Sequence, residues 1–202
     1  MTFTLPAPLK LAVITTIALA TAGCAQAMQR HGHQHGAMPE GAVEVSRAKA
    51  DIAGEGITGQ ATLIEYQHQT GKVVRVVLHV KGTNGALTPG RHGVHLHAVG
   101  ACVAPFTSAG GHFDPGPASN TDPDVNHPYH LGDLPNLEVN AQGEGHLDAV
   151  TTRVTLSDGP LTVFDGDGTA IIIHANPDQG VSGPAKSGVS GGPRIACGVV
   201  TR

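Results

Sequence analysis

The chain has 202 residues and a formal net charge of −4, which suits one ordinary domain and argues against a nucleic-acid partner. Trp is absent and aromatic residues make up only 3% of the chain, whereas glycine and proline number 28 and 14. Short runs of Val, Thr and Ile between these turn-forming residues predict strands rather than helices. The 13 histidines are many for this length and call for a chemical explanation.

Residues 1–27 resemble a secretory signal rather than part of a fold. Lys10 precedes an uncharged run over residues 11–22 that is too short to span a bilayer comfortably. The motif TAGC is similar to a bacterial lipobox, and cleavage after its glycine would leave Cys24 lipidated. An alternative A-x-A site at residues 25–27 would release a soluble protein. We favour the lipoprotein, and either route predicts export to the periplasm or cell envelope.

Residues 28–50 are predicted to form a polar, disordered tail or linker, because small polar residues do not pack a core. The tail contains HGHQHGAM over residues 31–38, an H-x-H-x-H run followed by methionine. This run is either a loose capture site for copper or zinc ions or a linker without a role. The folded domain is expected to cover residues 51–202.

From about residue 56 the pattern changes to short strands separated by turn residues. Residues 100–136 and 177–193 are rich in Gly and Pro and are expected to be long functional loops. The pattern predicts an all-β fold, an eight-stranded antiparallel Greek-key barrel or sandwich of the immunoglobulin-like type. The expected strands are 57–66, 72–80, 93–97, 137–139, 146–155, 161–164, 169–174 and 194–200.

Two cysteines remain when Cys24 is set aside, Cys102 and Cys197. Export permits disulfides, so one bond between them is the economical hypothesis. It would close a loop of 95 residues. Such a closure is worth about 4–5 kcal/mol in the chain-entropy model. The alternative is two separate buried thiols.

His95 and His97 lie two residues apart on an expected strand, so their side chains share one face and could share a metal ion. Alone, such a pair is weak evidence for a metal site, because surface pairs of this kind are common. Four further chemistry-bearing features strengthen it: GGHFDP, NHPYHLGDL, the apolar run IIIH and PRIACG.

Five blocks of the sequence resemble, in order and approximate spacing, those of the copper–zinc superoxide dismutase family: GVHLHAVGAC, SAGGHFDP, HLGDLPNL, DGDGTAIIIHANPD and RIACGVV. The resemblance covers about residues 55–200. The short interval between His97 and Cys102 is similar to that of the bacterial, exported branch. The resemblance implies an enzyme that converts superoxide to dioxygen and hydrogen peroxide, with one copper and one zinc per subunit.

The family also implies a ligand set. Imidazole suits copper in both oxidation states that the reaction needs, and the matching residues are His95, His97, His112 and His174. His112 would bridge to zinc, one metal on each ring nitrogen, and the tetrahedral zinc site would include His130 and Asp133. Asp178, four residues after His174, would link a copper ligand to a zinc ligand; without the resemblance it reads as an ordinary loop aspartate.

The zinc site departs from the family pattern in one place. The family usually has a zinc histidine nine residues before the one in the HLGD block, and this chain has Thr121 there, a poor ligand. His127, three residues before His130, is the histidine left in that loop. We expect a rebuilt loop to bring His127 to zinc. The alternative is an exposed His127 and a zinc site with three protein ligands or no metal.

By its position, Arg194 is expected to guide superoxide, because a guanidinium beside the copper can hydrogen-bond the anion and steer it. Steering matters since the chain is negative overall and repels anions. Lys186, in the preceding loop, either adds to a positive funnel or is a solvated lysine without a role. No interface motif is readable, so monomer and homodimer both stay open.

Two other functions compete with the dismutase. One is a dismutase-like copper-binding or storage module whose His-rich tail captures metal, and the other is a sandwich that has lost its metals. The second is weaker because all four copper positions and Arg194 are filled. The remaining histidines of the domain are expected to be surface or hydrogen-bonded residues: His68, His79, His92 and His146.

Overall fold

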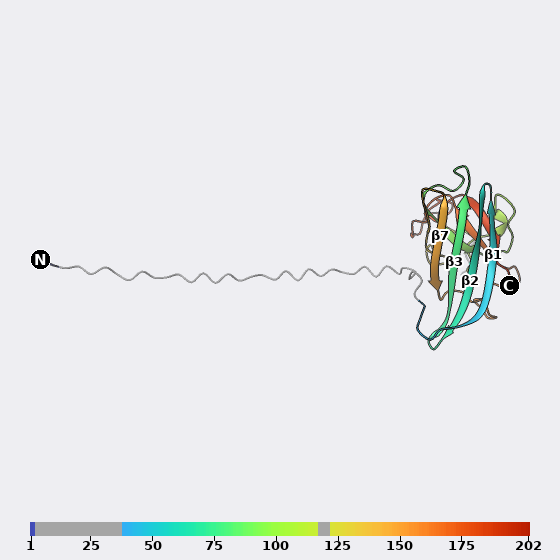
Figure 1. Ribbon diagram of the computed structural model, residues 1–202, viewed down its shortest axis with the longest axis horizontal. Helices are drawn as coiled ribbons and strands as arrows, with labels where there is room; N and C mark the ends of the chain where they lie inside the picture. Colours follow the sequence, from blue (N-terminus) through green and yellow to red (C-terminus); the bar gives the residue numbers. More distant parts are fainter. Residues whose placement is uncertain (3–37, 117–121) are drawn as a thin grey trace. The chain divides into compact units, whose positions relative to one another are not determined.

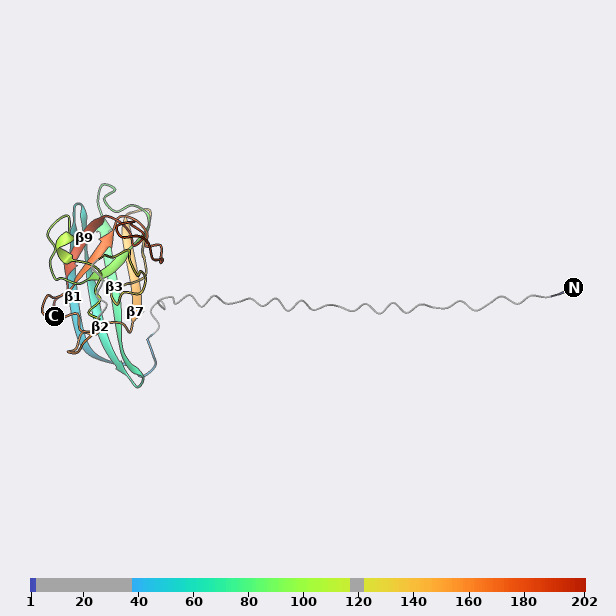
Figure 2. The ribbon, with the colours of Figure 1, turned by 180° about the vertical axis from the view of Figure 1, so that it is seen from behind.

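The strands form one antiparallel sheet that curls into a nearly closed barrel (Figure 1, Figure 2). The computed structural model describes residues 1–2, 38–116 and 122–202. The predicted signal segment with Cys24, most of the His-rich tail, and Thr121 lie outside these residues. Nowhere in the described ranges is there a helix long and apolar enough to cross a bilayer.

Nine strands are present in the described ranges, in the sheet order β4-β6-β7-β3-β2-β1-β9-β8-β5. Four of them, β1, β2, β3 and β7, lie side by side across one face of the barrel (Figure 1), and β9 comes to the front when the molecule is seen from behind (Figure 2). The strands are β1 (Val43–Gly54), β2 (Ile57–His68), β3 (Gly71–Gly82), β4 (Gly90–His92), β5 (Val94–His97), β6 (Leu137–Val139), β7 (Glu144–Thr151), β8 (Ala170–His174) and β9 (Arg194–Val199).

Alternating side chains build the core. In β3, Val74, Val76 and Leu78 are buried, while the residues between them are partly exposed. Because side chains of a strand point to opposite faces in turn, this pattern sends one set into the barrel. Burial of each such side chain is worth about 1.5–3 kcal/mol.

The two ends of the sheet order, β4 and β5, follow one another in sequence and are separated by Gly93, which nearly closes the sheet.

Two predictions about the elements are wrong. Residues 43–50, expected in the disordered tail, form the first part of β1, where Ala48 and Ala50 are buried against the core. Alanine carries too weak an apolar signal to mark the inward face of a strand. Residues 161–164, expected as a strand, make only an isolated bridge between Thr155 and Thr162. The Gly- and Asp-rich turns on both sides leave that segment too short to join the sheet.

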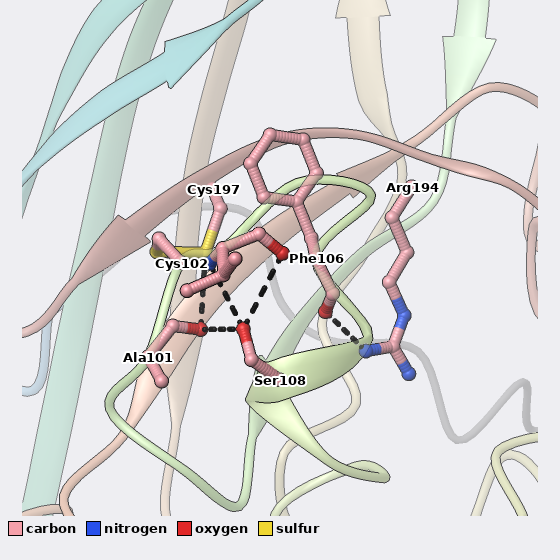
Figure 3. The surroundings of a disulfide bond; sticks show 7 residues. Ala101, Cys102, Phe106, Ser108, Arg194 and Cys197 are labelled. Carbon is pink, nitrogen blue, oxygen red and sulfur yellow. Dashed lines mark hydrogen bonds between the residues drawn. A yellow bond between two sulfur atoms is a disulfide. The ribbon is translucent and has the colours of Figure 1, made fainter.

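The two long loops are confirmed, as is the all-β antiparallel class. Between β5 and β6 the described residues contain one 3-10 turn, Thr107–Ala109. The disulfide between Cys102 and Cys197 ties the start of this loop to β9, with Cα atoms 5.6 Å apart (Figure 3). This pairing settles the hypothesis of one bond over two free thiols.

Candidate metal centre

A buried cluster of imidazoles and carboxylates lies where the loops meet β5 and β8. The six histidines are at most 1% exposed, and the two aspartates are also buried. Close-packed burial of so many polar groups is costly unless each finds a partner. The members are His95, His97, His112, His127, His130, His174, Asp133 and Asp178.

Backbone hydrogen bonds bring the loop segments of the cluster onto β5. Leu96 N donates to Gly132 O at 2.9 Å, and its carbonyl accepts from Phe113 N at 2.8 Å. Gly132 N in turn donates to Phe113 O at 2.8 Å. A Cβ at Gly132 would lie 2.3 Å from Leu96 O, so only glycine permits this approach. The histidines next to these residues are thereby placed against the strand that carries His95 and His97.

Four histidines form the first group, with one ligand atom from each lying within 4.8 Å of all the others: His95, His97, His112 and His174. In each ring one nitrogen has no hydrogen-bond partner among the described residues, namely His95 Nδ1 and Nε2 of the other three. The opposite nitrogens of all four rings are held by acceptors, for example His97 Nδ1 by Gly110 O at 3.0 Å and His174 Nδ1 by Gly192 O at 2.9 Å. Buried, unpartnered lone pairs that converge are the donor set that a metal ion requires.

The second group surrounds the carboxylate of Asp133. The Nδ1 atoms of His112, His127 and His130 lie 2.6, 3.3 and 3.4 Å from its oxygens. His112 therefore faces Asp133 with Nδ1 and the first group with Nε2. His95 also comes within 4.8 Å of this group, but Asp178 engages its Nε2. We therefore assign His95 to the first group and His130 to the second.

Asp178 joins the two groups. Its Oδ2 accepts from His95 Nε2 at 3.0 Å, and its Oδ1 accepts from His127 Nε2 at 2.7 Å. Asn136 fixes the aspartate in turn, since its side-chain oxygen accepts from Asp178 N at 2.8 Å and its amide donates to Asp178 O at 3.0 Å. One carboxylate thus orients one ring of each group.

Burial and neighbouring charge divide the rings by protonation. Burial lowers the pKa of His97 and His174 well below the usual value, and burial together with the charge of His95 lowers the pKa of His112 to about 3. His127 differs: burial opposes its charge, but hydrogen bonds to Asp133 and Asp178 outweigh it and raise its pKa to about 9. His97, His112 and His174 are therefore neutral and ready to donate lone pairs, whereas His127 carries a proton when no metal is bound.

Arg194, at the start of β9, lies beside the first group. Its guanidinium donates to Phe106 O at 2.7 Å (Figure 3). It also donates to Gly110 O at 2.6 Å, the carbonyl that His97 Nδ1 also contacts. Ser108 Oγ bonds Ala101 O at 3.1 Å and so steadies the same loop next to the disulfide. Lys186 is exposed in the second loop.

One positioning residue was missed from sequence. The buried carboxylate of Asp124 accepts from Gly188 N at 2.6 Å, from Ser190 N at 3.0 Å and from Ser190 Oγ at 2.7 Å. These bonds tie the segment that leads to His127 to the second long loop. Nothing in the sequence around Asp124 marks it, because its partners, Gly188 and Ser190, lie more than sixty residues away.

The comparisons with known proteins decide the family. The family model described as copper/zinc superoxide dismutase (SODC) matches residues 57–200. This chain belongs to that family. Copper and zinc are therefore its cofactors, and the predictions of the family, of a copper–zinc superoxide dismutase and of its metals are confirmed.

Individual dismutase relatives show how far the likeness extends. The superoxide dismutase (Cu-Zn) of Mycolicibacterium paratuberculosis is 39% identical over 144 residues, 58% of this chain and 59% of that protein. The chain thus spans about three fifths of that relative. The extracellular superoxide dismutase (Cu-Zn) of Brugia pahangi is 33% identical over 160 residues, 71% of this chain and 77% of that protein. A double mutant of a SOD-like protein from Bacillus subtilis is 30% identical, with a TM-score of 0.57 over 75% of this chain and 95% of that one.

Zinc uptake by the metal-free dismutase should release a proton from His127. With a pKa of about 9, the ring is protonated at pH 7, and a metal can bind Nδ1 only after the proton leaves. Zinc affinity should therefore rise by up to about tenfold per pH unit from pH 7 toward 9 and level off above it. Calorimetry in two buffers of different ionisation enthalpy measures the release. In His127→Ala the release should disappear; an unchanged release in that variant would contradict the assignment.

Proposed function

We propose that this protein catalyses the dismutation of superoxide to dioxygen and hydrogen peroxide at the buried histidine cluster. The observation that carries the proposal is the set of four convergent, unpartnered ring nitrogens beside the guanidinium of Arg194. A copper site alone needs only the nitrogens. A cationic donor that shares the Gly110 carbonyl with His97 adds a place for an anionic substrate.

We propose the following ligands. Copper is held by the unpartnered nitrogens of the first group: His95, His97, His112 and His174. Zinc is held by Nδ1 atoms and one carboxylate: His112, His127, His130 and Asp133. Three imidazoles and a carboxylate match the closed, four-ligand site that structural zinc prefers. The complete burial of His127 and its contacts with two aspartates support its place in this set over an exposed histidine.

Bound copper supplies electron transfer by alternating between two oxidation states, so that one superoxide is oxidised to dioxygen and a second is reduced to peroxide. The protein supplies the proton handling. His112 Nε2 faces the copper group, and Asp133 fixes the ring from its Nδ1 side. We assign to Nε2 the role of holding one proton and giving it to the departing peroxide, whose second proton comes from solvent. Burial, which lowers the pKa of this ring to about 3, favours the return of that proton.

A second candidate is a dismutase-like module that binds or stores copper without turning over superoxide. The likeness to a SOD-like protein of Bacillus subtilis supports it, as does the His-rich tail. Arg194 favours the enzyme, because metal storage has no need for a partly buried guanidinium next to the copper group.

We propose that the protein is exported and acts in the periplasm or cell envelope. The signal-like segment, the disulfide and the likeness to an extracellular enzyme of Brugia pahangi support export. We further propose that Cys24 is lipidated and attaches the protein to a membrane. Radiolabelled palmitate should be incorporated into the wild-type chain but not into Cys24→Ala. If neither chain is labelled, lipidation is refuted and the soluble protein released by cleavage after residue 27 is supported.

The central test measures dismutase activity, copper and zinc on one sample of purified protein. The proposal predicts about one copper and one zinc per chain and superoxide-dependent turnover that is lost on chelation and restored by copper. Full copper loading with negligible activity would instead establish the storage module. Omission of zinc tests the bridging role of His112. A protein loaded with copper alone should unfold at a lower temperature than the protein with both metals, while it still holds its copper.

Arg194→Ala should lower kcat/KM for superoxide by roughly tenfold or more and flatten its dependence on ionic strength, because the local positive field steers the anion. Arg194→Lys should restore part of the rate. Arg47→Ala is the matched control, since it removes the same charge from an exposed pair with Glu44 on β1. Equal rates and equal salt dependence in Arg194→Ala and Arg47→Ala would refute the steering role.

A further inference from the structure

Two histidines that the sequence left as ordinary surface residues face each other on the outside of the barrel. β3 and β7 are antiparallel, and their register pairs His79 directly with His146. Both side chains are exposed, while Leu78 and Leu147 beside them are buried. The pleat therefore turns the two imidazoles outward together, on strands different from those that carry the buried centre.

The spacing of the two rings is that of two ligands on one ion. Their Nδ1 atoms are 3.3 Å apart, and the ring centroids are 4.4 Å apart with an interplanar angle of 30°. Two nitrogens bound at roughly 2.0–2.1 Å to one tetrahedral metal ion lie about 3.3–3.4 Å from each other. Rigid, paired strands hold His79 and His146 at this separation, so little reorganisation is needed to bind a metal.

Carboxylates lie next to the pair. The register of β6 and β7 sets Glu138 opposite His146 on the side away from His79, and Glu138 is exposed, with Arg91 3.6 Å away. On β7, Glu144 lies two residues before His146 on the same face and pairs with Lys81 at 3.1 Å. Both histidines line a hollow of this surface together with Asn140 and Glu144. Carboxylate oxygens that could complete a metal site therefore lie beside the two imidazoles, with their charge balanced by Arg91 and Lys81.

We propose that His79 and His146 bind one divalent transition-metal ion of the borderline class, such as Zn²⁺, Ni²⁺ or Cu²⁺, through their Nδ1 atoms. Imidazole is the ligand that suits this class. Water completes the coordination, and Glu138 is the nearest candidate for a carboxylate ligand by register. The site is open and exposed, so its metal exchanges with solvent, in contrast to the buried centre. It is a peripheral metal site independent of the dismutase reaction.

The test titrates Zn²⁺ into the metal-loaded enzyme by calorimetry. The buried sites are then already filled, and Zn²⁺ reports only additional binding. To remove competition from the N-terminal histidine run, the titration uses a background in which His31, His33 and His35 are alanine. One saturable equivalent of Zn²⁺ is expected in this background, with the equivalent lost in both His79→Gln and His146→Gln.

His68→Gln is the matched control, because His68 is a partly exposed histidine at the end of β2 whose Nδ1 contacts Thr70 at 2.9 Å. It should keep the additional equivalent. Thermal unfolding and dismutase activity should be the same in all the variants, which separates loss of the site from loss of the fold. The absence of saturable Zn²⁺ binding in the background protein, or binding that survives in His79→Gln and His146→Gln, would overturn the proposal.

Discussion

The carboxylate of Asp178 is the contact on which the whole centre depends. Each of its oxygens accepts a hydrogen bond from a different buried ring, one from His95 and one from His127. Each bond fixes the orientation of its ring, so that Nδ1 of His95 points into the first group and Nδ1 of His127 points toward Asp133. Asn136 holds the aspartate through two further bonds, so the orientation of both groups is set by one anchored side chain.

The charge of the centre follows from the same arrangement. Hydrogen bonds to the histidines hold the pKa of Asp133 and Asp178 well below the usual range although burial opposes this, so both carboxylates stay ionised. His127 balances part of that charge with a proton when no metal is bound. A divalent ion bound at His127 would replace the proton and neutralise more of the charge, which would let so many polar groups be buried together.

Much of the all-β fold and of the histidine cluster could be predicted from the sequence, because the patterns that indicate them are local. His95 and His97 share a strand face by alternation alone, and the family blocks supply the order of the remaining ligands. The role of Asp124 could not be predicted, since it binds backbone groups of a distant loop. The His79 pair was hidden for a related reason: its partner is set by strand register, which a single sequence does not reveal. The start of β1 was not predicted, because its buried residues are alanines and alanine is only weakly apolar.

The loop segments that follow β5 have a further consequence for the state of the chain in solution. They occupy hydrogen-bonding groups on the open side of β5 through Leu96, Phe113 and Gly132, and so they cap a sheet edge. An uncapped edge offers unpaired N–H and C=O groups as a template for a second chain. His112 and Asp133 stand directly beside these capping residues. A metal ion held by these two residues would therefore stabilise the cap of the sheet edge as well as the centre.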